Sequence, residues 1–213
     1  MSKILLTTAY FPPIEYMALL LRPEPVFLEA EEHYRKQSYR NRMIILTANG
    51  PQSLSIPVVQ THQKMMIKEV EIDYKTEWQR HHWRTIVTAY NNSPFFIYYQ
   101  DFLAPFYEKK IKYLWDFNQE LLDVILKLLQ TKKEIFCTEQ FVEHDETASI
   151  DARFTIHPKL YATADYPFQT DVSYRQVFEE KFGFTPALSV LDLLCNKGNE
   201  SKSYLLATGI DER

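Results

Sequence analysis

Two adjacent histidines lie in the stretch WQRHHWRTIVTAYNNSPFF, residues 78–96, whose pattern predicts one amphipathic helix closed by Asn91-Asn92 and stopped by Pro94. At about 100° per residue, His82 falls on the apolar half of this helix and His81 on the polar half. An imidazole with an unperturbed pKa of about 6.5 can act as a general base that deprotonates a hydroxyl or an amine before acyl attack. The alternative is a core histidine with both ring nitrogens hydrogen-bonded, and the sequence leaves both interpretations of His82 open.

A second group of candidate residues is the run Arg40-Asn41-Arg42, at the start of a predicted strand. Alternate side chains of a strand share a face, so Arg40 and Arg42 could clamp a phosphate or carboxylate with bidentate hydrogen bonds. Asn41 between them could orient an acceptor. The alternative is a solvated or ion-paired start of the strand, with Glu31 or Glu32 as the partner.

Tyr10 and Arg84 complete the candidate site. Tyr10 follows the first predicted strand, at the edge of the sheet where ligands usually bind, and its phenol could hydrogen bond to a substrate. The alternative is a tyrosine that packs with its hydroxyl in water. Arg84 lies one helical turn from Arg80 and would extend a basic rim along the helix, unless it belongs to a plain solvated face.

Metal and nucleophile chemistry have little support in the sequence. His157 and His144 lie among residue types that bind metals, but no pair repeats at a recognised ligand spacing, so no metal site is predicted. Cys137 and Cys195 form no CxxC pair and no GxSxG motif occurs, so each cysteine is expected to be a lone buried thiol. The four glycines are isolated from one another, which excludes a Rossmann fingerprint and a P-loop. The sequence names no cofactor.

Composition narrows the class of protein. The chain has 213 residues, 46% of them hydrophobic, and a net charge of -4, which predicts a substantial core. No basic stripe is present, so nucleic-acid binding is not expected. No window approaches the roughly 18 apolar residues of a membrane helix, and the N-terminal aliphatic run is too short for a signal peptide. We therefore expect a cytoplasmic protein that binds a small molecule, with its oligomeric state undetermined.

The first thirty residues predict a βαβ unit. Residues 3–8 contain the apolar run Ile4-Leu5-Leu6, residues 14–21 carry a helical pattern, and Val26-Phe27-Leu28 forms a second apolar run. Strand, turn, helix and strand in this order are typical of a βαβ unit with parallel strands. The loop after the first strand is then the expected ligand edge.

Residues 42–74 predict a β-hairpin and a further strand. Runs of β-forming residues at 42–47 and 54–59 flank Asn49-Gly50, a strong signal for a tight hairpin turn. Residues 70–74 alternate apolar and acidic side chains, which is typical of a strand with one face in water.

The remainder of the chain is predicted to be mainly helical. After the helix at 78–96 we expect helices at 105–112 and from an Asp116 N-cap onwards, and then a strand at 135–137. Residues 139–171 show no sustained period. Two more helices are predicted, from Ser173 to Phe182 and from residues 186–189 to Gly198. Asp192, inside the last helix, is expected to pair with a buried arginine or to cap toward Ser189.

Together these elements predict an α/β fold. It consists of a mixed sheet with an N-terminal βαβ unit, a β-hairpin, a packed helical layer and a C-terminal helical appendage. Residues 1–138 are predicted to form the α/β core domain. Residues 139–213 are predicted to form an irregular loop and the helical appendage, packed on the core as one unit.

Several stretches, taken in order, resemble the WbqC-like family of bacterial proteins. They are YFPP at 10–13, SYRNR at 38–42, LSIPV at 54–58 and WQRHH at 78–82, which runs on to AY and PFF. Near the C-terminus, YRQVF, FGF and LSVLDLL are similar to the branch of this family found in Bacteroidetes-type bacteria. Met43 and Cys195-Asn196 depart from the family pattern without disturbing the order of these motifs.

The resemblance implies a role in the biosynthesis of surface polysaccharide or O-antigen. It implies transfer of a glycyl, aminoacyl or acyl group to a sugar-nucleotide or sugar-lipid precursor. Under this hypothesis Arg40 and Arg42 hold the anionic group of a sugar phosphate, His82 is the base, and Tyr10 and Asn41 orient the acceptor. The rival hypothesis is a non-catalytic accessory protein of the same pathway that binds a carbohydrate or a partner protein.

Overall fold

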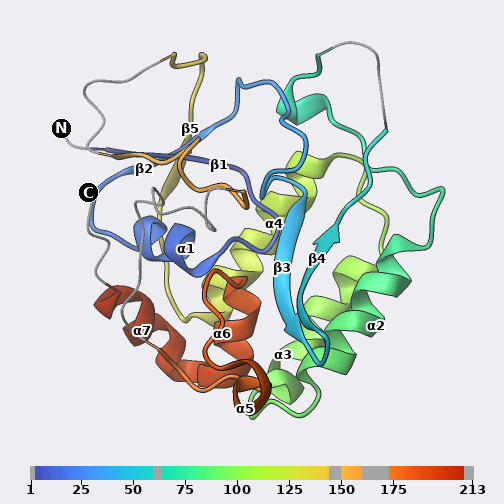
Figure 1. The fold of residues 1–213 in the computed structure, drawn as a ribbon. Helices are drawn as coiled ribbons and strands as arrows, with labels where there is room; N and C mark the ends of the chain where they lie inside the picture. Colours follow the sequence, from blue (N-terminus) through green and yellow to red (C-terminus); the bar gives the residue numbers. More distant parts are fainter. Residues whose placement is uncertain (1–2, 60–63, 144–149, 160–172, 209–213) are drawn as a thin grey trace.

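The predicted βαβ unit is confirmed in the computed structural model, which describes residues 3–59, 64–143, 150–159 and 173–208. β1 (Ile4–Thr7) runs parallel to β2 (Val26–Glu29), and α1 (Ile14–Leu20) connects them. β5 (Ile135–Cys137) and β6 (Ile150–Asp151) join as parallel outer strands in the order β5-β2-β1-β6 (Figure 1). The carboxyl ends of these four strands therefore meet at one edge of the sheet.

The predicted hairpin is formed by β3 (Arg42–Thr47) and β4 (Gly50–Ser55), in a sheet of its own. The α/β class is thus confirmed, with parallel and antiparallel strands in two sheets instead of one mixed sheet. The ladder closes at Thr47 and Gly50, so the turn consists of only two residues. Against the prediction of 54–59, the second strand begins at Gly50, because this tight turn starts the pairing at once. Gly50 has a φ of 101°, a conformation that favours glycine.

Helices pack around the two sheets (Figure 1). α2 (Trp78–Tyr90) packs against β3, and α4 (Leu114–Leu128) passes behind the hairpin in this view. The helix predicted from Trp78 is confirmed as far as Tyr90 and ends at Asn91-Asn92 as predicted, and α3 (Phe96–Leu103) follows after Pro94. On α2, His82 is buried and His81 is exposed, as the helical pattern predicts.

The strand predicted at 70–74 is not formed. A 3-10 helix, η1 (Ile67–Glu69), precedes it, and the backbone of the segment then divides its hydrogen bonds between two neighbours. The N–H of Ile72 donates to the carbonyl of Lys112, whereas the N–H of Asp73 donates to the carbonyl of Pro57. Single bridges to two partners do not make a ladder, so an alternating pattern gives extended chain without a strand.

Two helix predictions are corrected nearby. The helix predicted at 105–112 is only the 3-10 helix η2 (Ala104–Tyr107), because the following residues turn to bond with the segment that contains Ile72. α4 begins at Leu114 with Tyr113 as its N-cap, so Asp116 lies in the first turn and is not the cap. There its carboxylate still faces the positive end of the helix dipole.

The C-terminal part contains three short helices and a 3-10 turn. The helix predicted from Ser173 is reduced to α5 (Glu179–Phe182). The residues before α5 are not helical, and there the Tyr174 hydroxyl donates to Oδ2 of Asp192 at 2.6 Å. Asp192 therefore pairs with a tyrosine, neither with a buried arginine nor as a cap. The elements that follow are α6 (Val190–Lys197), η3 (Gly198–Glu200) and α7 (Ser201–Ala207).

Backbone hydrogen bonds join the C-terminal part to the rest of the fold. The N–H of Ser189 donates to the carbonyl of Ile44, and the N–H of Val190 donates to the carbonyl of Pro12. The Ser189 hydroxyl also caps α6 by accepting the N–H of Leu191 at 3.2 Å. The division of the chain into domains at residue 138 stays a prediction.

Candidate functional site

Tyr10 and His82 are far apart in the sequence, but the fold brings them together in the core. The Tyr10 hydroxyl lies 3.0 Å from Nδ1 of His82 and 2.8 Å from the hydroxyl of Tyr107. All three side chains are buried. Tyr10 lies on the loop after β1, at the expected ligand edge, but its ring turns inward and packs against Phe117 at 5.8 Å between centroids. The network therefore ties this loop to α2.

The environment of His82 keeps its imidazole neutral. Burial, followed by the nearby charge of His81, lowers the pKa of His82 to about 3, although a hydrogen bond to the backbone of Ser55 acts in the opposite direction. One N–H of the ring is thus used by Ser55, and Nδ1 is left to accept the hydroxyl proton of Tyr10. With its hydrogen-bonding capacity used and its basicity reduced, His82 has the surroundings expected of a core histidine.

Arg40 is engaged by an acidic residue. Its Nε donates to Oε1 of Glu32 at 2.7 Å, and its Nη2 donates to Oε2 of the same carboxylate. Both side chains are at most 3% exposed, so this bidentate pair fills the place where a ligand would have to bind. The ion pair with Glu32 is the alternative that the sequence left open. Arg40 also precedes β3, which begins at Arg42, so strand alternation does not pair the two arginines.

Asn41 and Arg42, the last two residues of the SYRNR motif, differ in their surroundings. Asn41 donates its side-chain amide to the carbonyl of Ile56 at 2.8 Å, which holds the start of β3 to the residue after β4. Arg42 is half-buried and donates its Nε to the Ser55 hydroxyl at 3.2 Å. Arg42 is thus the member of the motif that keeps a guanidinium available at the surface.

A group of cationic side chains gathers around His157, and we call Arg35, Arg42, His157 and Lys159 the cation surface. Burial lowers the pKa of His157, and the positive charges of Arg40, Lys159, Arg42 and Arg35 lower it further. The N–H of Lys159 donates to Nδ1 of His157 at 3.1 Å, so the neutral ring carries its proton on Nε2. His157 therefore offers a donor to an anion.

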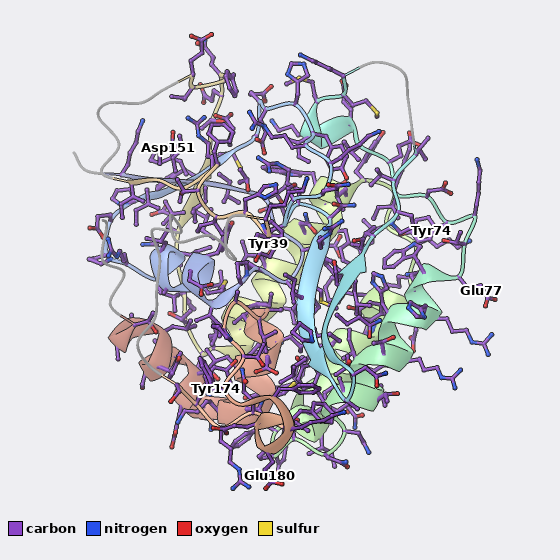
Figure 2. The ribbon with its side chains drawn as sticks, in the orientation of Figure 1. Tyr39, Tyr74, Glu77, Asp151, Tyr174 and Glu180 are labelled. Atoms are coloured by element: carbon purple, nitrogen blue, oxygen red, sulfur yellow. The ribbon has the colours of Figure 1, made fainter. Side chains whose placement is uncertain are left out.

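The cation surface follows the carboxyl ends of the parallel strands. Arg35 comes shortly after β2 and His157 shortly after β6, and Figure 2 shows Asp151 at the end of β6 and Tyr39 beside the start of the hairpin. The guanidinium of Arg35 stacks over the ring of Phe154 at 4.1 Å from its centroid. Within the described ranges, Arg35, Arg42 and Lys159 form no ion pair with an acidic side chain.

The carboxylates at the same edge of the sheet are neutralised internally. Arg153 is fully buried and bonds Glu29 at 2.7 Å and Asp151 at 2.6 Å. Glu29 also accepts the hydroxyl of Thr138 at 2.6 Å. These contacts cross-link the ends of β2, β5 and β6, so Glu29 and Asp151 are paired with Arg153 and not with the cation surface.

Comparison with known proteins identifies the family. A family model described as the WbqC-like protein family matches residues 8–166. The chain belongs to this family. The uncharacterised protein Rv1507c of Mycobacterium tuberculosis is 28% identical over 234 residues, which cover 96% of this chain and 98% of that protein. No solved structure matches.

The part of the chain matched by the WbqC-like family contains both the Tyr10–His82 contact and the cation surface. Arg84, in contrast, lies on the exposed face of α2 and is not among the charges that act on His157. The sequence drew attention to His157 only as a metal-ligand type, and it gave no weight to Arg35 or Lys159. A count of cations after each predicted parallel strand would have found Arg35 but neither His157 nor Lys159, because β6 was not predicted.

In the described part of the chain, no helix is long and apolar enough to cross a membrane. The same residues contain no group of three or more histidine, cysteine or acidic side chains placed to hold a metal ion.

Proposed function

We propose that this WbqC-like protein is a transferase that acts on a sugar-nucleotide or sugar-lipid precursor of surface polysaccharide. The transferred group is a glycyl, aminoacyl or other acyl group. In this reaction a hydroxyl or amine of the acceptor attacks the carbonyl carbon of the donor, a new ester or amide bond forms, and the leaving group departs with the electron pair and the proton. The cation surface binds the phosphate of the precursor.

The cation surface is the observation that carries the proposal. Three permanent charges, those of Arg35, Arg42 and Lys159, act on one histidine without a carboxylate partner among the described residues. A phosphate group would form charge-assisted hydrogen bonds to the guanidinium groups and accept the Nε2 proton of His157. The position after the carboxyl ends of parallel strands is also where open α/β sheets bind their ligands.

The other predicted site residues serve in this proposal to position the cation surface. The Arg40–Glu32 pair fixes the turn that leads into β3, and so sets the position of Arg42. Asn41 holds the same turn to the end of β4. The contact between Tyr10 and His82 anchors the loop after β1 to α2.

The second candidate function is a non-catalytic accessory protein of the same pathway that binds the precursor or a partner. The surroundings of His82 favour it, because a base with a pKa of about 3 and occupied nitrogens is poorly suited to proton abstraction. Both candidates require the cation surface, and they differ in whether a product forms.

Calorimetric titration with nucleotide sugars, for example UDP-glucose, UDP-N-acetylglucosamine and GDP-mannose, tests the proposal. We expect binding by the wild type and a loss of about tenfold or more in Arg42→Ala and Lys159→Ala, since each removes a charged hydrogen bond. The exposed Lys109→Ala is the matched control and should bind as the wild type does. Equal affinities in Arg42→Ala, Lys159→Ala and the wild type would contradict the proposed site.

Incubating the bound precursor with aminoacyl and acyl donors then separates the two candidates. Mass spectrometry of the precursor should show the added acyl group if the protein is a transferase. Binding without any mass increase, across the donor panel, would favour the accessory protein.

A further inference from the structure

A surface depression of about 490 Å³ lies between β4 and the start of α2. Ser53 and Ser55 contribute one wall, Thr76, Glu77 and His81 contribute the other, and Trp78 lies in its lining. Glu77 marks the start of α2 in Figure 2. A volume of this size lies within the range of small-molecule sites. Nothing in the proposed function uses this depression.

The polar groups of the depression are almost all uncharged. Ser53, Ser55 and Thr76 supply hydroxyls that both donate and accept, and His81 supplies an exposed imidazole. Among the described residues, the lining contains no lysine or arginine, and Glu77 supplies the one carboxylate. A carboxylate accepts hydrogen bonds from hydroxyls and repels phosphates. The lining therefore selects against anions and in favour of neutral ligands rich in hydroxyl groups.

Trp78 adds an independent sign of a missing ligand. Its side chain is 5% exposed, and among the described residues its indole N–H has no hydrogen-bond acceptor. A buried donor in native proteins is normally paired, so the indole N–H of Trp78 needs an acceptor that the described residues do not supply. Because Trp78 lines the depression, a molecule bound there would contact this side chain and change the surroundings of its indole.

We infer that this depression is a binding site for an uncharged sugar ring. Such a ring presents hydroxyls that match Ser53, Ser55, Thr76 and Glu77, and it has a C–H face that can pack on the apolar part of the lining. The site is adjacent to the cation surface, because Ser55 lines the depression and accepts the Nε proton of Arg42 at 3.2 Å. A sugar phosphate could thus place its phosphate on the cation surface and its ring in the depression. The inference deepens the proposed function, but its test needs no phosphate.

Nuclear magnetic resonance of the nitrogen-15-labelled protein provides this test. The chain has three tryptophans, so three indole N–H signals are expected, and Trp78→Phe identifies the one of interest. The probes are uncharged sugars: the methyl glycosides of glucose, galactose and mannose, and N-acetylglucosamine. We expect at least one of them to shift the Trp78 indole signal saturably in the wild type.

Filling the depression should abolish this response. Ser53→Phe, at an exposed strand position, should weaken binding at least tenfold, while Ser203→Phe, at an exposed position on α7, should leave it unchanged. The backbone spectrum reports whether each variant is folded, and Thr76→Tyr replaces Ser53→Phe if that variant is not. The inference is overturned if no uncharged sugar shifts the signal, or if the filled variants bind normally. A nucleotide sugar that still binds through Arg42 in that case would leave the proposed function in place.

Discussion

The hydroxyl of Tyr10 lies 3.0 Å from Nδ1 of His82, although Tyr10 occupies the loop where a ligand contact was expected. The hydroxyl of Tyr107 completes the group at 2.8 Å from that of Tyr10. Both residues were candidates for a role in chemistry, and in the structure they form a buried contact that joins the loop after β1 to α2. The positive charge near the carboxyl ends of the parallel strands lies instead on the cation surface.

The stability of the protein should fall as the pH falls from 6.5 to 3. The pKa of His82 is about 3 in the folded state and about 6.5 in the unfolded state, so the unfolded chain binds the extra proton within this window. The contribution of His82 is fully present above pH 6.5 and is lost on acidification, with a total on the order of 5 kcal/mol. Urea denaturation at a series of pH values measures it.

His82→Gln is the informative variant for this pH dependence. The glutamine amide can donate to Ser55 and accept from Tyr10 without titrating, so the difference between the wild type and the variant isolates His82. The exposed neighbour provides the control, since His81→Gln should keep the slope of the wild type. An unchanged slope in His82→Gln would show that His82 is not held neutral by burial.

Tyr10→Phe should destabilise the protein more than Tyr107→Phe does. Removing the Tyr10 hydroxyl leaves both Nδ1 of His82 and the hydroxyl of Tyr107 without this partner, at a cost of about 1–3 kcal/mol. Removing the Tyr107 hydroxyl leaves the Tyr10–His82 bond intact, at a cost of about 1 kcal/mol. The free energies of unfolding in urea compare the two, and the reverse order would contradict the assigned network.

Arg40→Ala should destabilise the fold by about 3–5 kcal/mol, because it leaves the buried carboxylate of Glu32 without its partner. Arg40→Met combined with Glu32→Gln removes both charges and should recover much of this loss. Chemical denaturation of the single and double variants checks the prediction. If Arg40→Ala is as stable as the wild type and loses only ligand binding, Arg40 is a ligand contact after all.

Glu15→Gln should stabilise the protein at pH 8. Burial raises the pKa of Glu15 to about 7, so the carboxyl favours the neutral form and its ionisation opposes folding. Its contribution is fully present below pH 4.5 and is lost as the pH rises to about 7. Glutamine avoids this loss, so we expect a gain on the order of 3 kcal/mol at pH 8 and almost none at pH 4. Equal gains at the two pH values would contradict the burial of an ionisable Glu15.

Local patterns predicted the parts of the fold in which one face or one run is apolar. The run Ile4-Leu5-Leu6 and the helical period around His82 both reflect burial that the neighbouring residues share. The prediction of a strand at residues 70–74 was wrong, because alternation describes exposure and does not show whether one continuous partner strand is present. The hairpin was predicted with Asn49-Gly50 in its turn, but the turn consists of residues 48 and 49, and Gly50 already begins the second strand.

The site was harder to predict, because its residues depend on distant parts of the chain. Tyr10 and Tyr107 are 97 positions apart, and no local pattern connects them. Arg40 and Glu32 were considered as partners, but only the tertiary fold shows that the pair is buried. His157 lies in a segment without a helical or strand period, so its charged neighbours become visible only when the ends of β2 and β6 meet.

The titration of His157 by nuclear magnetic resonance tests the central claim, an anion on the cation surface, most directly. His157→Gln identifies its signal among the six histidines of the chain. In the free protein its pKa should lie below 6.5, because burial and the surrounding cations disfavour the imidazolium. Saturating inorganic pyrophosphate should raise this pKa, since the added negative charge favours protonation, and the rise should be smaller in Arg42→Ala. A pKa of His157 that does not change with pyrophosphate would contradict the account.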